Sequence, residues 1–204
     1  MTNRLLFAIV IQCSLYGLSY NTSLAQTFGF RLGPNLATQQ MKQGRLMLKP
    51  GYIVRLHAGA FVNSDIGENF CFQVEVGYSG LGHQGVYANN LNSSNYHYGT
   101  AGVIFKYYPN KKVSFLAGPQ LGYLLGGKTS AGQNVSDLPP DREDLNAVIG
   151  AEFYPTQLIG VGLRYNYGIT SLDVLSDNTK IYNRAIQLSL IFRIPGYQLK
   201  ESGY

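Results

Sequence analysis

Residues 145–169 alternate between apolar and other side chains over two long runs. Every second residue is apolar or aromatic from Leu145 to Phe153 and again from Ile159 to Ile169, with Pro155-Thr156-Gln157 between the runs. This alternation predicts a hairpin of two strands. A core-facing strand rarely reaches the eleven residues of the second run, and the glycines on its opposite parity do not suit a well-solvated surface. A strand of about ten residues with an apolar outer face is typical of a barrel that crosses a membrane.

The N-terminal residues 1–25 have the layout of a secretory signal. Arg4 supplies a positive charge, residues 5–18 form a short apolar run, and Ser23-Leu24-Ala25 places small residues where a signal peptidase cleaves. Polar residues interrupt the run, which is also shorter than the roughly 20 residues that a transmembrane helix needs. We therefore expect a signal peptide over residues 1–25. No later segment has a longer apolar run, so a membrane location would require strands.

The composition of the chain argues against several functions. The net charge is +5, and the basic residues are scattered, so nucleic-acid binding gains no support. Only Cys71 follows the predicted signal, so no internal disulfide is expected. The three histidines, His57, His83 and His97, show no metal-ligand spacing, and we expect neither a metal site nor a cofactor.

The chain after the signal divides into eight predicted strands, at residues 28–36, 52–62, 70–81, 96–107, 113–125, 144–154, 158–169 and 181–194. The connections at 37–51, 82–95, 126–143 and 170–180 are long and polar, whereas those at 63–69, 108–112 and 155–157 are short. This pattern predicts an all-β fold, an eight-stranded antiparallel up-and-down transmembrane β-barrel over residues 26–194. Short turns and a C-terminal tail of residues 195–204 would lie in the periplasm, and long loops outside.

Aromatic residues concentrate near the ends of these strands. The end with short turns has Phe28, Phe30, Phe70, Phe72, Tyr107, Phe115, Phe153 and Phe192, and the other end has Tyr52, Tyr78, Tyr96, Tyr98, Tyr123, Tyr165, Tyr167 and Tyr182. Aromatic side chains favour both membrane interfaces because an apolar ring can lie in lipid while a polar group reaches water. We therefore expect two aromatic girdles.

Three segments resemble those of a known family. They are FGFRLGPNL at residues 28–36, AGPQLGY at 117–123 and GVGLRYNYG at 160–168. With them, the whole chain after the signal is similar to the small outer-membrane β-barrels of Bacteroidota that are often labelled PorT-like. The resemblance implies an integral barrel in the outer membrane of a Gram-negative bacterium. Its motifs concern the fold, so it assigns no functional residue.

The parity that faces the barrel interior carries charged residues. They are Arg31, Arg55, His57, Glu75, Lys106, Glu152, Arg164 and Arg193, and glycines share their parity. Eight strands enclose a lumen just wide enough for side chains, where unpaired charges are costly. We therefore predict a charge network that plugs the lumen; a selective pore lined by positive charge is the alternative.

Two contacts within this network follow from the expected strand pairing. Counting back from the turn at 63–69 places His57 opposite Glu75, with Arg55 on the neighbouring diagonal. Nearer the periplasmic end, Glu152 would face basic residues across the lumen, namely Lys106, Arg31 and Arg193. Only two inward carboxylates would thus face five inward arginines and lysines, so that loss of one carboxylate would leave several positive charges unmatched.

The most plausible function from sequence is a structural or interaction role, not an enzymatic one. Membrane lipid would surround the barrel, and the loop at 126–143, rich in Gly, Ser, Asn, Asp and Pro, would contact an extracellular partner. Two other classes stay open. A soluble lipocalin-like barrel for an apolar ligand would need the apolar parity inside, and a lipid-modifying barrel enzyme would need a carboxylate close to His83 and Ser79. No catalytic residue is assigned.

Overall fold

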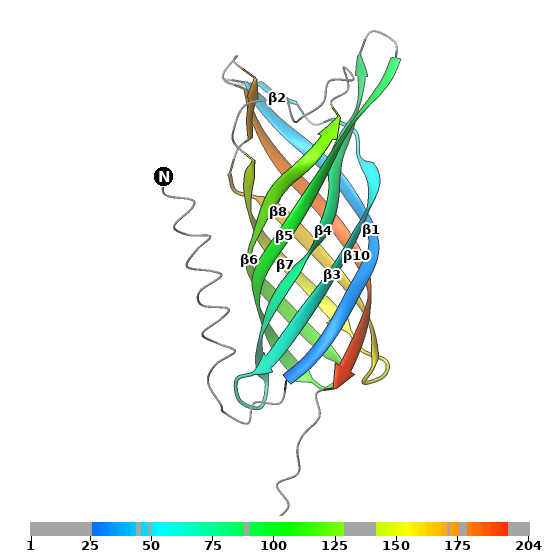
Figure 1. The fold of residues 1–204 in the computed structure, drawn as a ribbon, viewed down its shortest axis with the longest axis vertical. Helices are drawn as coiled ribbons and strands as arrows, with labels where there is room; N and C mark the ends of the chain where they lie inside the picture. The colour runs from blue at the N-terminus through cyan, green and yellow to red at the C-terminus, as the bar shows by residue number, and fades with distance from the viewer. Residues whose placement is uncertain are drawn as a thin grey trace, which may run out of the picture.

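The computed structural model describes residues 26–43, 46–48, 50–87, 90–128, 142–170, 172–175 and 179–195. The predicted signal peptide, residues 129–141 of the long loop and residues 196–204 of the predicted tail lie outside the described residues. Within those ranges the regular structure is β-strand (Figure 1), and no helix is long and apolar enough to cross a membrane. The strands are β1 (Gln26–Gln43), β2 (Leu46–Leu48), β3 (Ile53–Asp65), β4 (Phe70–Tyr87), β5 (Asn90–Asn110), β6 (Val113–Lys128), β7 (Glu143–Phe153), β8 (Ile159–Gly168), β9 (Leu172–Leu175) and β10 (Thr179–Pro195).

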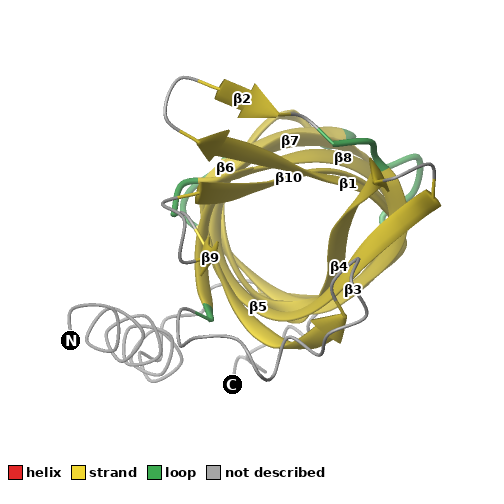
Figure 2. Cartoon of the chain, turned by 90° about the horizontal axis from the view of Figure 1, so that it is seen from above, coloured by secondary structure: helices red, strands yellow, loops and turns green. Residues whose placement is uncertain are grey.

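These strands form one antiparallel sheet that closes on itself. The order is β2-β1-β3-β4-β5-β6-β7-β8-β10-β9, and β1 also pairs with β10 from Thr27↔Pro195 to Lys42↔Lys180. The short strands β2 and β9 pair only with the ends of β1 and β10, so the other eight strands make the ring seen from above in Figure 2. The predicted eight-stranded antiparallel barrel is confirmed. We call the end with the three short connections the turn end and the opposite end the loop end.

The strands extend further at the loop end than the sequence predicts. The segment 82–95, expected as a loop, is instead a ladder in which β4 and β5 stay paired as far as Tyr87↔Asn90, and this hairpin rises above the rim in Figure 1. Gly82 lies at its base with a φ of +151°, where a β-carbon would meet the carbonyl oxygen of Ser94 at 2.1 Å. The prediction failed because a ladder outside the membrane needs no apolar face.

The barrel is apolar outside and polar inside. Exposed apolar side chains on the outer wall include Phe30, Leu32, Val54, Leu56, Val76, Leu125, Ile149, Leu163, Leu188 and Ile194. Buried polar side chains inside include Asn35, His57, Gln73, Lys106, Glu152, Arg164, Gln187 and Ser189. A lipocalin-like barrel needs the reverse arrangement, whereas a lipid-exposed wall around a polar lumen is the pattern of membrane barrels.

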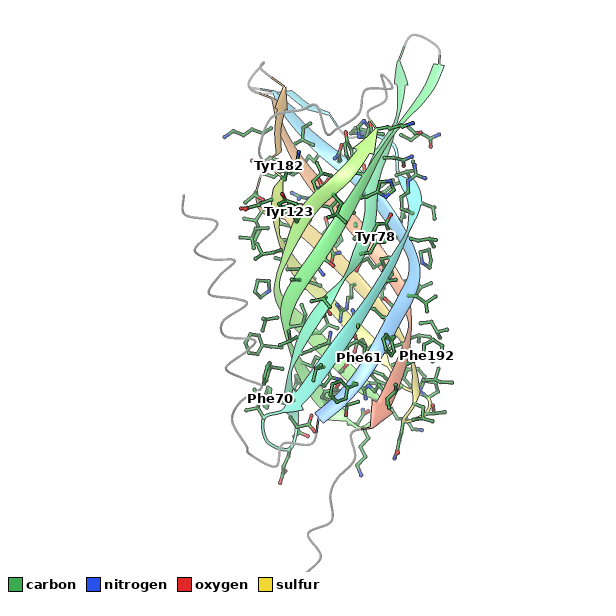
Figure 3. The ribbon with its side chains drawn as sticks, in the orientation of Figure 1. Phe61, Phe70, Tyr78, Tyr123, Tyr182 and Phe192 are labelled. Carbon is green, nitrogen blue, oxygen red and sulfur yellow. The ribbon has the colours of Figure 1, made fainter. Side chains whose placement is uncertain are left out.

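Aromatic side chains mark both ends of the apolar wall. In Figure 3, Phe70 and Phe192 lie at the turn end, and Tyr78, Tyr123 and Tyr182 lie towards the loop end. The prediction was wrong for Tyr96 and Tyr98, which are buried inside the barrel with Leu81 and Leu124. Both tyrosines have the even parity that faces the lumen throughout β5, so they close part of the loop end from within.

Candidate functional site in the barrel lumen

Five charged side chains from five strands meet in the lumen. Glu75 comes from β4 and Glu152 from β7, and Arg31, Lys106 and Arg164 come from β1, β5 and β8. The Nζ atom of Lys106 lies 2.7 Å from Glu152 Oε2. Arg164 bridges the two carboxylates, with Nη1 3.0 Å from Glu75 Oε2 and Nη2 3.1 Å from Glu152 Oε1. Arg31 Nη2 also contacts both, at 3.5 Å from Glu75 and 3.3 Å from Glu152. We call these five residues the lumen network.

Neutral donors complete the bonding of both carboxylates. Gln73 and Gln120 donate to Glu75 through their Nε2 atoms, at 2.5 Å and 3.1 Å. The hydroxyl of Tyr154 donates to Glu152 Oε2 at 2.7 Å, and Ser114 Oγ donates to the same oxygen at 3.4 Å. Buried charges are costly unless they are paired and hydrogen-bonded, and both carboxylates meet these two conditions.

Glycines provide the space for these long side chains. Four network residues have a glycine as cross-strand partner, in the pairs Arg31↔Gly59, Glu75↔Gly102, Glu152↔Gly162 and Arg164↔Gly150. A β-carbon at Gly150 would stand 2.9 Å from Cγ of Arg164 and 2.4 Å from the carbonyl oxygen of Leu163. Directly opposite residues are the closest pairs in a sheet, so the glycines allow the charged side chains to cross the lumen.

The predicted pairing of His57 with Glu75 is wrong. His57 lies opposite Ser79, and Glu75 lies opposite Phe61. The Nε2 atom of His57 contacts Ser189 Oγ at 2.9 Å. Glu75 instead lies beside Glu152, because both carboxylates bind the same arginines.

Two other predicted members lie apart from the network. Among the described residues, Arg55 Nη1 donates to the carbonyl oxygen of Val54, at 3.4 Å, and the expected diagonal contact with Glu75 is not formed. Arg193 does not bind Glu152 within the described residues; its Nη2 donates to Tyr108 OH at 2.7 Å, and its guanidinium lies 3.2 Å from the ring centroid of Tyr154. The predicted residues therefore divide between the network and its surroundings.

An aromatic layer separates the lumen network from the turn end. Phe61, Tyr154 and Ile191 form a buried cluster against which Tyr108 packs. The Phe61 ring centroid lies 5.3 Å from both Arg31 Cζ and Lys106 Nζ, within the range of cation–π attraction. Figure 3 shows Phe61 at the turn-end side of the barrel. Charge and aromatic layers thus fill this half of the lumen.

A second set of polar contacts lies towards the loop end, and it includes a carboxylate that the sequence prediction missed. Asp144 is 1% exposed and accepts a hydrogen bond from Asn183 Nδ2 at 2.7 Å. Asn183 Oδ1 accepts from Gln39 Nε2 at 3.0 Å, and Gln39 Oε1 lies 2.6 Å from His83 Nδ1. The sequence could have revealed it, because Asp144 stands an even number of residues before Glu152 in a predicted strand and therefore faces the same side.

The arrangement provides little support for catalysis or metal binding. Ser79 Oγ accepts a hydrogen bond from Asn35 Nδ2 at 3.0 Å, while His83 contacts Gln39, so the described residues do not join Ser79 and His83 in a catalytic pair. In the part of the chain that the structure describes, no three His, Cys, Asp or Glu side chains are grouped to bind a metal ion.

Two small interior cavities are found among the described residues. One of about 20 Å³ adjoins Arg31, Glu75 and Arg164, and another of about 10 Å³ adjoins Asp144 and Asn166. A cavity of about 10 to 15 Å³ holds one water molecule. The paired charges and the small cavities therefore support a closed lumen.

Comparison with known proteins agrees with the barrel architecture. A family model described as "Outer membrane protein beta-barrel domain" matches residues 23–174. No curated protein matches the chain.

Several solved structures are similar to this one. Ail of Yersinia pestis, in complex with the heparin analogue sucrose octasulfate, is 15% identical, with 83% of this chain and 100% of that chain covered and a TM-score of 0.45. Neisserial surface protein A is 14% identical, with 81% and 97% covered and a TM-score of 0.46. OprG of Pseudomonas aeruginosa is 11% identical, with 85% and 98% covered and a TM-score of 0.46.

Proposed function

Because the chain belongs to the outer membrane protein β-barrel family, we propose that this integral outer-membrane protein has a structural or interaction role and a lumen plugged by its charge network. The observation that carries the plug is the set of five ion-pair contacts among Arg31, Glu75, Lys106, Glu152 and Arg164. These contacts join strands on several sides of the ring. An open pore would have to separate charges that are fully or almost fully removed from solvent.

The interaction role rests on the loop end. Four of the seven connections between barrel strands meet there, and the one between β6 and β7 is the longest of the seven. Binding residues are concentrated on such loops when a rigid scaffold holds them. The loop end faces the exterior in this proposal, and an extracellular partner binds there.

The finer family assignment and the non-enzymatic role belong to the same proposal. The resemblance of residues 28–36, 117–123 and 160–168 supports a PorT-like barrel. The separate hydrogen bonds of Ser79 and His83 support a role without acyl transfer. Neither observation names a ligand, so the partner is defined only by its location outside the cell.

Conductance in planar lipid bilayers tests the plug. We expect the parent protein to give no steady current, and the double variant Glu75→Gln/Glu152→Gln to leak, because three cations without carboxylates repel one another and admit water. Glu68→Gln, an exposed change in the β3–β4 turn, is the matched control and should stay closed. Steady anion-selective current through the parent would instead identify the selective pore lined by positive charge.

A further inference from the structure

A groove of about 510 Å³ lies on the outer wall of the barrel at the loop end. It extends over β8, β10 and β1, which are neighbours in the sheet. Thr38, Gln40 and Arg184 line it together with three tyrosines, Tyr52, Tyr165 and Tyr167. It is separate from the lumen network, because Arg184 has the outward parity of Ile186, Leu188 and Leu190.

Arg184 is the only basic residue among the described residues that line this groove. Its Nη1 donates to the carbonyl oxygens of Gly168 at 2.7 Å and Asn183 at 2.8 Å, and its Nη2 donates to Gln40 Oε1 at 3.3 Å. The guanidinium lies 3.6 Å from the ring centroid of Tyr167. These contacts fix its position at the wall.

No described carboxylate forms an ion pair with Arg184. These carbonyl, amide and ring contacts, and a further one with the Tyr182 ring at 5.7 Å, are all to neutral groups. Asp144, whose side chain contacts Asn183 and Thr170 on the lumen side, interacts with Arg184 only at longer range than an ion pair. A fixed guanidinium that forms no ion pair, at the edge of a groove, is suited to an anion, and arginine matches the geometry of phosphate oxygens.

The groove is amphipathic along the membrane normal. On its turn-end side, Leu36 and Ile186 continue into the apolar wall, with Leu188 next along β10. On its loop-end side, Lys180 is exposed on the same face of β10 as Arg184. An occupant would therefore meet hydrocarbon below and positive charge above.

The wall beside Tyr52 is fixed by hydrogen bonds. Thr38 Oγ1 donates to the carbonyl oxygen of Pro50 at 2.9 Å. Gly51 and Gln84 exchange backbone hydrogen bonds of 2.6 Å and 3.0 Å. The groove is therefore formed before any ligand binds, which lowers the entropic cost of binding.

We propose that this groove binds the phosphorylated head group of a membrane lipid, with the phosphate at Arg184 and an acyl chain along Leu36 and Ile186. Basic sites at the membrane interface recognise anionic lipid head groups in this way. The exposed tyrosines suit the same interface, where a ring lies in lipid and its hydroxyl reaches polar groups. The site is independent of the plug and of the loop partner.

Native mass spectrometry of the full-length protein in detergent micelles tests the lipid site. The probes are phosphatidic acid and diacylglycerol with identical acyl chains, which differ only in the phosphate. We expect the parent to retain phosphatidic acid and not diacylglycerol. Arg184→Gln should weaken phosphatidic acid binding about tenfold or more, since it removes a charge-assisted contact. Lys180→Gln should weaken binding by a smaller factor.

Lys112→Gln, which removes an exposed charge at the turn end, is the matched control and should bind like the parent. A variant is folded if its unboiled sample migrates faster on gels than its boiled sample. Equal retention of both probes by the parent, or an equal loss in Lys112→Gln, would overturn the proposal. So would competition by millimolar inorganic phosphate, which would indicate a site for free anions. If Arg184→Gln does not fold, Lys180→Gln decides, and unchanged phosphatidic acid binding there counts against the lipid site.

Discussion

Glu75 and Glu152 share the same two arginines, although their strands β4 and β7 are not neighbours in the sheet. Arg164 binds one carboxylate with each of its terminal nitrogens, and a single nitrogen of Arg31 contacts both. The two carboxylates therefore act as one unit with three cations around it. Loss of either carboxylate changes the surroundings of the other.

Replacement of Glu152 tests how much these paired charges contribute to the free energy of unfolding. We expect Glu152→Gln to lower the free energy of unfolding by about 3–5 kcal/mol, because a buried pair is broken from one side and the charge of Lys106 is left unmatched. Urea titration in detergent, followed by the folded band on unboiled gels, measures the change in midpoint. Glu68→Gln at the exposed turn should shift the free energy by less than about 0.5 kcal/mol. Equal urea midpoints for the two variants would show that Glu152 does not contribute this free energy.

The glycine opposite Arg164 should also be sensitive to substitution, although less so than Glu152. Gly150→Ala places a β-carbon 2.4 Å from a backbone oxygen, so the strand or the arginine must shift, at a cost of about 1–3 kcal/mol. Gly126→Ala is the matched control because nothing lies within 4 Å of its added β-carbon. The urea midpoint should fall for the first variant and stay near that of the parent for the second. An unchanged midpoint for Gly150→Ala would show that the lumen network can accommodate the added β-carbon.

Cys71 reports whether the turn-end half of the lumen is closed. Its side chain is 2% exposed, inside the barrel near Asp65 and Lys106. We expect a charged maleimide to label this thiol slowly in the folded barrel and fast after urea unfolding. Labelling of Phe61→Ala should be faster than that of the parent, because Phe61 packs in the aromatic layer of that half. Rapid labelling of the folded parent would show that solvent reaches the lumen from the turn end.

The connection between β6 and β7 should be dispensable for folding. Replacement of residues 129–141 by a short Gly-Ser linker should leave the heat-modifiable gel band intact, since loop closure entropy changes slowly with length. Binding of the extracellular partner to whole cells would be lost if that partner recognises this loop. A variant that no longer gives the folded band would show that the connection contributes to the fold.

The fold could be predicted from sequence because the alternation of side chains along each strand shows which residues face lipid and which face the lumen. The alternation in residues 145–169 identified β7 and β8, and the same rule placed Arg31, Lys106 and Arg164 in the lumen. Each strand had only two choices of face. A wrong choice would have put several charges into lipid.

The partners inside the lumen could not be predicted with the same rule. The predicted pairing of β3 with β4 was displaced by four residues, because β3 runs to Asp65 and pairs with Cys71 across a turn that contains Gly67 at a φ of +89°. An even displacement keeps every side chain on its face but changes its neighbour. His57 therefore pointed inward as expected, yet opposite Ser79. Contacts across the ring, such as Arg31 with Glu152, depend on barrel geometry that no local pattern encodes.

The pairing of β1 with β10 determines the order in which the protein can assemble. The first and last strands of the barrel must meet before the ring is complete, and until then both expose unpaired edges that favour aggregation. Such distant pairing makes folding slow. Arg31 and Glu152 are 121 residues apart and come together only when β1 and β7 belong to the same ring. A chain cut before β10 would therefore keep its charges unmatched and its edges open, and quality-control proteases would have an unfinished substrate to degrade.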